Sequence, residues 1–550
     1  MAVPLKFSMK LAGTDFHFTG IGRPGFLRVR RGTWLFLAVF LVLLVLTPLA
    51  LLFLSLGEPS ASFRAISNTL LPRYAVNTLL IAVGTGTLTL LIGVSLALLT
   101  SLFTFPGARF FRFALLLPLA FPAYIAAYVY AGMFAYAGPL HLLGRSLGRD
   151  NWHFDLLHLP GLIAVLSLVL YPYVFATTRV AIESRYTSYL ESARSLGIER
   201  NKLIFKVLLP LLRPAIAGGV FLVTMEVLND YGAMKYFGIP TFTTGIFTAW
   251  FSLGDLGSAV RLSLYLFFLV ALLGGLESWI HKRNAVAESH RSRPIERRAL
   301  HGWKAGLATG YASAIFVSAF VLPLLYLVYL INMSDASRAS EEWWHLAFNS
   351  LLTALSGAAV VIVVVVLTQF VRQLVRTRFS FWLGKSIAVG YTIPGAIIAI
   401  GVMIFSKYAD QWIDRGLFLS GSLGALLLAY AVRFSGVAYQ PIHAESEKQS
   451  GRLFEAGLSV GLSPFKLLTR VFLPLSGKGI LIASTLVMID IFKELPLTLI
   501  LRPFNFDTLA TKAFEYADDE MLTRAALPAL SLVIVGLIPV LLLHRMLRTK

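Results

Sequence analysis

Residues 191–210, ESARSLGIERNKLIFKVLLP, have a counterpart in residues 455–474, EAGLSVGLSPFKLLTRVFLP. In both stretches a glycine follows the first glutamate after six positions, and a proline follows that glycine after thirteen. The residues are Glu191, Gly197 and Pro210 in the first stretch, and Glu455, Gly461 and Pro474 in the second. Each stretch is polar and basic and stands between long apolar runs. The two stretches are therefore expected to be equivalent loops that join membrane spans.

The composition around these loops is that of a membrane protein. Of the 550 residues, 57% are hydrophobic and only 14% are charged, and the mean hydropathy is +0.75. A soluble chain could not bury that much apolar surface, so the composition indicates a polytopic membrane protein. The net charge of +20 fits Lys and Arg gathered in cytoplasmic loops, and no motif indicates nucleic acid as a partner. The absence of cysteine excludes disulfides and cysteine-based metal sites.

Twelve segments are apolar over the length of about 20 residues that a helix needs to cross a bilayer. They form two sets of six and predict an all-α membrane protein with about twelve transmembrane helices. The segments are 34–56, 77–103, 111–136, 159–182, 207–229, 260–281, 305–331, 348–371, 386–407, 422–444, 476–492 and 525–544. The first is too long for the core of a signal peptide and is expected to be an uncleaved span.

The distribution of Lys and Arg predicts the orientation, because basic residues favour cytoplasmic loops. The N-terminal segment, both repeated loops, the linker and the C-terminus are basic, so both termini are expected in the cytoplasm. The expected parts are a cytoplasmic segment 1–33, a first half 34–281 with the loop 186–210, a linker 282–304, and a second half 305–550 with the loop 450–474. The linker is charged and non-periodic, which is typical of a tether.

The internal repeat extends beyond the two loops. Asn77 and Asn349 differ by 272 positions, as do Pro122 and Pro394; the loops differ by 264. Two further pairs also differ by 264, namely Asp230 with Glu494 and Asp255 with Asp519. Because each half is expected to begin and end inside, the halves are predicted to be parallel repeats about an axis along the membrane normal.

Each repeated loop is expected to form two short helices that bend at its glycine, since glycine adopts φ values that other residues resist. Small residues follow each glutamate, Ser192 and Ala193 in one loop and Ala456 and Gly457 in the other. They allow another surface to approach closely. The alternative is an amphipathic loop helix at the lipid headgroups, which the identical spacing in two loops disfavours.

This pattern of glutamate, small residues, glycine and a final Leu-Pro is similar to the cytoplasmic EAA loop of bacterial ABC importer permeases. The resemblance implies a type I permease fold, a multi-pass location in the bacterial inner membrane, and a loop that docks on a separate ATPase subunit. Two loops in one chain imply a fused form that binds two copies of the ATPase. The implied coupling residues are Glu191, Ser192, Ala193, Gly197, Pro210, Glu455, Ala456, Gly457, Gly461 and Pro474. The loops depart from the family pattern at Ser192 and Gly457, where alanine is usual, but both residues are small.

A narrower resemblance concerns the solute. Residues 493–511, KELPLTLILRPFNFDTLAT, resemble ferric-iron permeases, which are relatives of thiamine, phosphonate, sulfate and polyamine permeases. Iron delivered by a periplasmic binding protein is the implied cargo, and the other solutes are the alternatives. Fe(III) prefers oxygen ligands, but Glu494, Asp507 and Glu515 are too scattered to predict a metal site. They are expected to shape an outer gate or to contact the binding protein.

The chain is not expected to be an enzyme. A phosphate-binding loop needs the pattern G-x-x-x-x-G-K-[ST], and Gly384, Lys385 and Ser386 match only its end, because Phe379 occupies the place of the first glycine. No cofactor is therefore expected on this chain, and ATP and Mg²⁺ are expected on the partner ATPase.

Ionisable groups in or near spans are costly and tend to face a cavity. The candidates for a gate or pathway are Glu226, Asp230, Arg433, Asp490, Glu494 and Asp507. Alternatives are that the acids extend to the interface and that Arg433 pairs with Asp490. An ion-driven secondary transporter is the rival class, but it would need acids at broken helices near the midplane. An integral-membrane enzyme is a third class, which no nucleophile–base pair or metal cluster supports.

Overall fold

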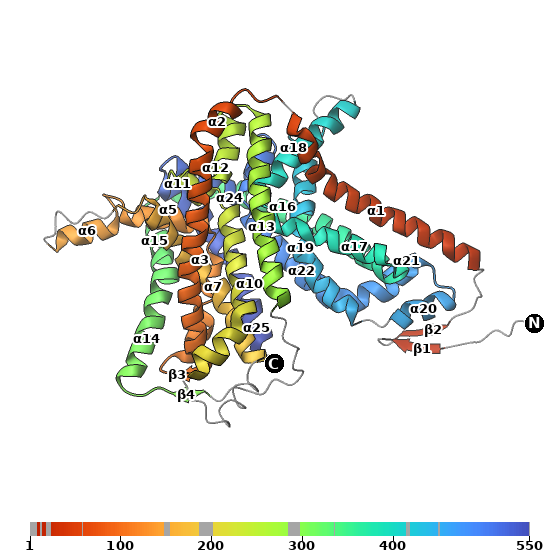
Figure 1. The fold of residues 1–550 in the computed structure, drawn as a ribbon, viewed down its shortest axis with the longest axis horizontal. Helices are drawn as coiled ribbons and strands as arrows, with labels where there is room; N and C mark the ends of the chain where they lie inside the picture. The colour runs from red at the N-terminus through yellow and green to blue at the C-terminus, as the bar shows by residue number, and fades with distance from the viewer. Residues whose placement is uncertain are drawn as a thin grey trace, which may run out of the picture. The chain divides into compact units, whose positions relative to one another are not determined.

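The structure is a computed structural model, and it describes most of the chain. The described residues are 8–11, 14–17, 24–57, 59–147, 155–185, 202–283, 297–334, 336–413, 418–448 and 451–548. Nearly all of them are helical, and the strands among them form two short two-stranded sheets (Figure 1). The expected all-α membrane fold is confirmed.

The first half and the segment before it contain the following elements in chain order. From the N-terminus to the linker they are β1 (Ser8–Leu11), β2 (Thr14–His17), α1 (Pro24–Leu54), η1 (Ser55–Gly57), α2 (Phe63–Thr69), α3 (Leu71–Leu102), β3 (Phe103–Thr104), α4 (Ala108–Ala114), η2 (Leu117–Ala120), α5 (Ala123–Phe134), α6 (Pro139–Ser146), α7 (Leu159–Arg185), η3 (Leu203–Leu208), α10 (Leu209–Asn229), α11 (Gly232–Tyr236), α12 (Phe242–Phe247), η4 (Thr248–Ser252) and α13 (Leu256–Arg283).

The linker and the second half continue the list. They contain β4 (Arg298–Ala299), α14 (Trp303–Phe316), η5 (Val317–Val321), α15 (Leu322–Asn332), α16 (Ala336–Val375), α17 (Arg378–Ile387), η6 (Ala388–Thr392), α18 (Gly395–Ile413), α19 (Leu423–Glu447), α20 (Gly451–Ser459), α21 (Pro464–Leu467), η7 (Leu468–Phe472), α22 (Leu473–Lys493), α23 (Pro496–Leu501), α24 (Leu509–Asp518) and α25 (Leu522–Arg548). The segments η3, η4, η5 and η7 are π-helical, and the other η segments are 3₁₀-helical.

The spans agree with the sequence expectation in outline. Among the described residues, ten helices are long and apolar enough to cross a membrane, and one bent helix pair adds an eleventh candidate. The helix α19, of 25 residues, corresponds to the remaining expected segment, 422–444. Each of the twelve expected segments is therefore represented by a helix or by a bent pair.

Two expected spans are not continuous helices, which corrects the sequence prediction. The expected span 111–136 breaks before Pro122, and the helical pieces on either side are bent by 94°. The expected span 386–407 breaks in the same way before Pro394, between η6 and α18. A proline disfavours the helical conformation in the residue before it, and Phe121 and Ile393 are accordingly extended, with ψ of 120° and 126°. The repeated prolines thus mark the same break in both halves.

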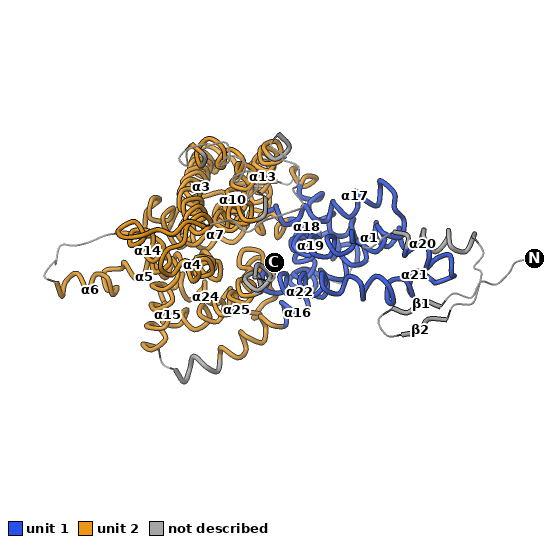
Figure 2. The backbone as a smooth tube through the Cα atoms, turned by 90° about the horizontal axis from the view of Figure 1, so that it is seen from below, with its two compact units in different colours: residues 1–52, 352–393, 401–491 blue, residues 53–351, 394–400, 492–550 orange. Residues whose placement is uncertain are grey.

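The chain divides into two compact units, which do not coincide with the two halves (Figure 2). Unit 1 consists of residues 1–52, 352–393 and 401–491, and unit 2 of residues 53–351, 394–400 and 492–550. Within unit 2, the helices α3, α7, α10 and α13 pack side by side (Figure 1). Within unit 1, η6 packs against α19 so closely that a Cβ on Gly390 would lie 1.8 Å from the carbonyl oxygen of Val432.

Matching hydrogen bonds inside unit 2 show the repeat in atomic detail. The Nδ2 of Asn77 donates to the carbonyl oxygen of Pro240 over 2.9 Å, and the Nδ2 of Asn349 donates to that of Asp507 over 3.0 Å. The next residue of each helix also accepts a backbone N–H. The hydroxyl of Thr78 accepts from Phe242, and the hydroxyl of Ser350 accepts from Leu509. These bonds fix the helices α3 and α16 to the equivalent segments α12 and α24.

The same bonds correct one expected equivalence. Thr241 and Thr508 start α12 and α24 with the same capping box, and these threonines differ by 267 positions rather than 264. The second half therefore has three more residues between Glu494 and Thr508 than the first half has between Asp230 and Thr241. As a result Asp519 directly follows α24 as its C-cap, whereas Asp255 directly precedes α13, so these two acids are not counterparts.

Candidate functional site

The second repeated loop, residues 450–474, is a helix, a bend and a second helix. The helix α20 ends at Ser459, and the N–H of Leu462 donates to the carbonyl oxygen of Gly457 over 3.0 Å. Gly461 lies between them with a φ of +85°, a left-handed conformation that closes helices and favours glycine. The side chain of Ser463 then caps α21 by accepting the N–H of Lys466. The expected bend at Gly461 is confirmed.

The helix α20 has one exposed and one buried side. Glu455 and Ala456 are exposed, whereas Phe454 and Leu458 are buried. Gly457 has a different environment, because a Cβ on this residue would lie 2.5 Å from Cδ2 of Leu467 in α21. The small residue at 457 thus allows the loop to pack on itself, whereas the small residue at 456 leaves the outer surface clear.

Aromatic rings anchor the buried side of this loop within unit 1. The ring centroid of Phe370 in α16 lies 6.3 Å from that of Phe454 and 5.7 Å from that of Phe472. Trp34 of α1 also packs against Phe370, with a centroid distance of 5.2 Å. The loop therefore rests on α16, which α1 contacts in turn, and it leads through the π-helical segment η7 into α22, near whose start lies Pro474.

A charged cluster holds the end of α19, the helix that leads into the second loop. The guanidinium of Arg372 in α16 donates to Glu447 over 2.8 Å and approaches Nδ1 of His443 at 2.6 Å. The neighbouring Gln373 donates to the carbonyl oxygen of Ser446 over 3.0 Å. These contacts fix the last turn of α19 to α16 directly ahead of the loop.

Most of the first repeated loop, residues 186–210, lies outside the described residues. This applies to Glu191, Ser192, Ala193 and Gly197. Its end is described, and Pro210 lies in the first turn of α10 after the π-helical segment η3. Both loops therefore re-enter a long helix through a π-helical segment followed by Leu-Pro. The coupling roles of both loops stay predictions.

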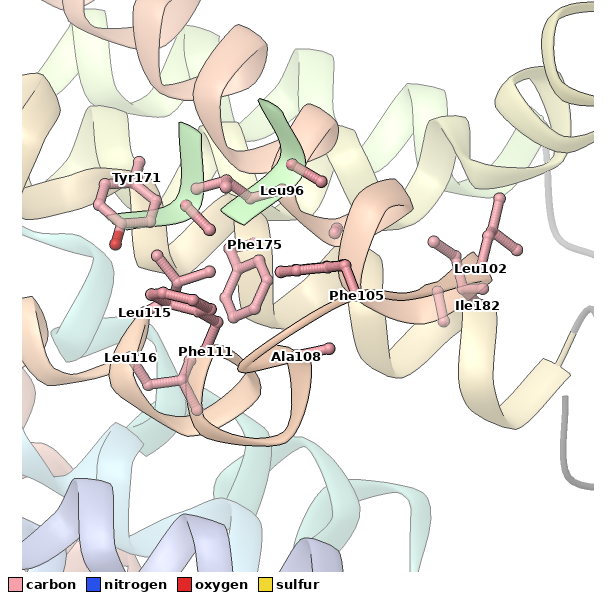
Figure 3. Close-up of a cluster of buried hydrophobic side chains, with 14 of the residues drawn as sticks. Leu96, Leu102, Phe105, Ala108, Phe111, Leu115, Leu116, Tyr171, Phe175 and Ile182 are labelled. Carbon is pink, nitrogen blue, oxygen red and sulfur yellow. The ribbon is translucent and has the colours of Figure 1, made fainter. Parts of the chain in front are cut away.

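The two ends of the first loop pack in one hydrophobic cluster of unit 2 (Figure 3). Ile182 of α7 lies before the loop and Leu208 of η3 lies near its end, and both are fully buried in this cluster. The cluster also contains Leu102 at the end of α3 and Phe111 of α4. A displacement of the loop would therefore act on several helices of the first half at once.

Salt bridges hold the end of α7 in a similar way, but with other partners. Glu183 accepts from Nε of Arg179 over 3.2 Å and from Nη2 of Arg297 over 3.1 Å. Arg179 in turn donates through Nη1 to the carbonyl oxygen of Arg112 over 2.5 Å. The sequence prediction missed these residues and those around Glu447, although Glu183 and Glu447 differ by the loop offset of 264.

Asp230 and Glu494, two of the candidate pathway acids, occupy equivalent positions and make equivalent bonds. An oxygen of Asp230 accepts the N–H of Ala233 over 2.8 Å, and an oxygen of Glu494 accepts the N–H of Leu497 over 3.2 Å. Both acids are buried, and each bond caps the first turn of a short helix, α11 or α23. The structure therefore gives both acids a capping function, and their role in a gate or pathway stays a prediction.

The residues next to these acids connect the long helices to the two proline breaks. Asn229, before Asp230, accepts the N–H of Gly395 at the start of α18 over 2.8 Å. Lys493, before Glu494, donates to the carbonyl oxygen of Leu119 in η2 over 3.3 Å. Both contacts lie within unit 2. The chain turns after α10 and α22 thus hold the breaks at Pro394 and Pro122 in place.

The other candidate pathway residues have separate environments. Glu226 accepts from the hydroxyl of Tyr173 over 3.3 Å. Asp507 forms salt bridges with Arg502 and, over 3.7 Å, with Lys512. Arg433 is buried in α19, and Asp490 is half-buried in α22. A pathway role for Arg433 and a salt bridge between Arg433 and Asp490 both stay predictions.

Fold and repeat together define the class of the protein, a polytopic helical membrane protein with an internal repeat. Residues 89–285 match the family described as the binding-protein-dependent transport system inner membrane component. The chain is also 25% identical over 526 residues, 93% of its length, to the Fe(3+)-transport system permease protein FbpB 2 of Haemophilus influenzae, of which the match covers 98%.

Two further relatives match part of the chain. The sulfate transport system permease protein CysT of Escherichia coli is 28% identical over 39% of this chain and 75% of its own length. A probable molybdenum ABC transporter permease protein of Haloferax volcanii is 26% identical over 37% and 72%. Together the matches support an ABC importer permease, a multi-pass inner-membrane protein, in a fused form that resembles the ferric-iron permease.

Proposed function

We propose that this chain is the permease subunit of an ATP-driven importer that moves ferric iron from a periplasmic binding protein into the cytoplasm. Its halves, residues 34–281 and 305–550, form the pathway, and both termini and the linker 282–304 lie in the cytoplasm. The two repeated loops each bind one copy of an ATPase subunit, which supplies ATP and Mg²⁺. The binding protein docks on the opposite loops, 230–259 and 493–524.

The observation that carries this proposal is the build of the second repeated loop. Its exposed side bears Glu455 and Ala456, and its buried side is fixed by aromatic rings to α16, which α1 contacts in turn. A helix with one exposed side and one buried side transmits the displacement of a docked subunit to the helices on which it packs. Such a contact couples ATP hydrolysis to transport only if it differs between two states of the permease.

Ferric iron is favoured over other solutes by the similarity to a relative named as an Fe(3+) permease, which extends over nearly the whole of both chains. The sulfate and molybdenum permeases match only about two fifths of this chain. Acidic residues near the ends of the long helices, Glu226, Asp230 and Glu494, also suit a cation better than an oxyanion.

Transport by the reconstituted complex tests the proposal. The chain is purified with its ATPase, placed in proteoliposomes, and supplied outside with an iron-loaded periplasmic binding protein. We expect radioactive iron to accumulate inside only when ATP is present with the ATPase. Uptake of sulfate or molybdate in place of iron would overturn the solute, and uptake driven by a proton gradient without ATP would overturn the class of transporter.

A further inference from the structure

The end of the linker is part of the first half's packing. Residues Arg298 and Ala299 form β4, which pairs in parallel with β3, Phe103–Thr104, directly after α3. The N–H of Leu300 donates to the carbonyl oxygen of Thr104 over 2.8 Å. The side chain of Leu300 packs against the hydrophobic cluster that contains Ile182 and Leu208. Residues 297–300 are therefore attached to the helices that flank the first repeated loop.

Arg297 extends this attachment to the end of α7. Its Nη2 lies 3.1 Å from Oε1 of Glu183, and both side chains are 27% exposed. The same carboxylate oxygen also accepts from Arg179 over 3.2 Å, and Arg179 is bonded to the backbone of Arg112 in α4. Arg297 thus joins a network that ties the linker to α7 and α4 at once.

Glu183, the acceptor in this network, lies directly before the first repeated loop. Glu183 lies eight residues before Glu191, just as Glu447 lies eight residues before Glu455. In the second half Arg372 of α16 supplies the cation for Glu447, so that the half is held by its own helices. The residue of α3 at the corresponding place is Thr100, 272 positions earlier, which cannot form a salt bridge. In the first half Glu183 receives one cation from its own helix, Arg179, and a second from the linker, Arg297.

We propose that Arg297 is a positioning residue for transport, and that linker residues 297–300 form a strut for the first repeated loop. The strut fixes the end of α7, so that a displacement of the loop by the ATPase moves the first half rather than bending α7. This inference rests on the proposed function of the two loops. It gives the linker a second role besides that of a tether.

The test compares substitutions at two adjacent arginines in the full-length chain, assembled with the ATPase and the binding protein. Arg297→Ala removes the salt bridge, and Arg297→Lys keeps the charge. Arg298→Ala is the matched control, because Arg298 is exposed and contributes to the strut through its backbone. The two readouts are solute transported per ATP hydrolysed and hydrogen exchange of the amides in residues 176–185.

Arg297→Ala is expected to lower the solute transported per ATP about fivefold, the lower end of typical coupling effects, and to speed exchange at the end of α7. Arg297→Lys should restore most of both quantities, and Arg298→Ala should change neither. If Arg297 acts through Glu183, then Arg297→Ala should have little further effect in a Glu183→Gln background. A flexible insertion after Ala287 lengthens the tether and should leave both readouts unchanged.

Three outcomes would overturn the strut. These are unchanged exchange in Arg297→Ala, faster exchange without any loss of coupling, and equal effects of Arg297→Ala and Arg298→Ala. A wild-type chain that shows no ATP-dependent uptake would overturn the proposed function instead. The exchange measurement needs no transport and still decides whether Arg297 holds α7.

Discussion

The helices α7 and α19 each carry a glutamate at an equivalent position near their ends, but the two glutamates bind different partners. Glu183 binds Arg179 of its own helix and Arg297 of the linker, whereas Glu447 binds Arg372 of α16 and lies 3.8 Å from His443. The hydrophobic anchors differ in the same way. Phe370 and Phe472 hold the second loop, and their counterparts in the first half are Leu98 and Leu208.

This difference shows which features the repeated fold requires. Both halves need a carboxylate that fixes the last turn of the helix before the loop, and both need an apolar anchor under the loop. The element that supplies the cation and the type of anchoring side chain are free to vary. In the first half that freedom allows the linker to become part of the support, which could not occur in a permease assembled from two separate chains.

The largest expected effect concerns the aromatic anchor. Phe472→Ala removes a fully buried ring that contacts Phe370 and Phe454, and loss of a buried phenylalanine costs about 3–5 kcal/mol. Leu208→Ala at the equivalent position should cost about 2–5 kcal/mol. Thermal unfolding of the two variants in detergent checks the order, and Phe465→Ala, on an exposed ring of the same loop, is the control.

If Leu208→Ala proves more damaging than Phe472→Ala, the anchors are not equivalent in function. The cluster around Leu208 would then contribute more to the stability of the protein than the aromatic rings around Phe472. That result would favour a stronger mechanical role for the first loop.

The next effect concerns the exposed glutamates. Glu455→Ala alters an exposed side chain and should leave the thermal stability unchanged, yet it should lower ATP-driven uptake about tenfold, as expected for the loss of a contact worth about 1.4 kcal/mol. Glu191→Ala should do the same, and the double variant should uncouple ATP hydrolysis from uptake. Uptake and ATPase activity are measured in the same proteoliposomes.

Equal losses of uptake in the two single variants would mean that both loops contribute equally to coupling, despite their different supports. A loss confined to one variant would show that the comparison between the halves extends to coupling. Normal uptake by the double variant would contradict the coupling role of both loops. Ser459→Ala, on the same helix, is a suitable control for assembly.

The sequence predicted the repeat better than it predicted the breaks and supports. Apolar runs of about 20 residues are sufficient to locate spans, and the second loop bends at Gly461 as expected. The breaks at Pro122 and Pro394 were missed because the apolar runs continue through them. The supports around Glu183 and Glu447 were missed because a pair formed by distant residues leaves no local pattern. The three extra residues before Thr508 likewise became visible only through the matching hydrogen bonds.

A smaller effect is expected at the two capping acids. Asp230→Ala and Glu494→Ala each leave a backbone N–H of a short helix without its acceptor, which typically costs about 1 kcal/mol. Asp230→Asn and Glu494→Gln keep an oxygen in place and should retain most of that stability. Thermal unfolding of the four variants compares the halves directly. If the amide variants are as unstable as the alanine variants, the charge of the acids stabilises the fold and the cap does not.

The smallest effect separates Asp255 from Asp519, the two acids that the sequence had paired. Burial acts to raise the pKa of the Asp255 carboxyl, but hydrogen bonds outweigh burial and hold the pKa below its ordinary value. They come from the N–H of Ser258 over 2.9 Å, the N–H of Ser62 over 2.8 Å, and the hydroxyls of Ser258 and Ser60. The bonds link η1–α2 to the start of α13.

A carboxylate whose pKa is lowered by folding stabilises the protein above its unfolded pKa of about 3.9, and this contribution is lost as the pH falls through the folded pKa. The difference in unfolding temperature between the wild type and Asp255→Asn should therefore be constant from pH 7 to about pH 5 and should shrink towards pH 3. Asp519→Asn, on an exposed residue, is the matched control for an Asp→Asn change outside these hydrogen bonds. A difference between the wild type and Asp255→Asn that stays constant down to pH 3 would mean that the bonds around Asp255 do not lower its pKa.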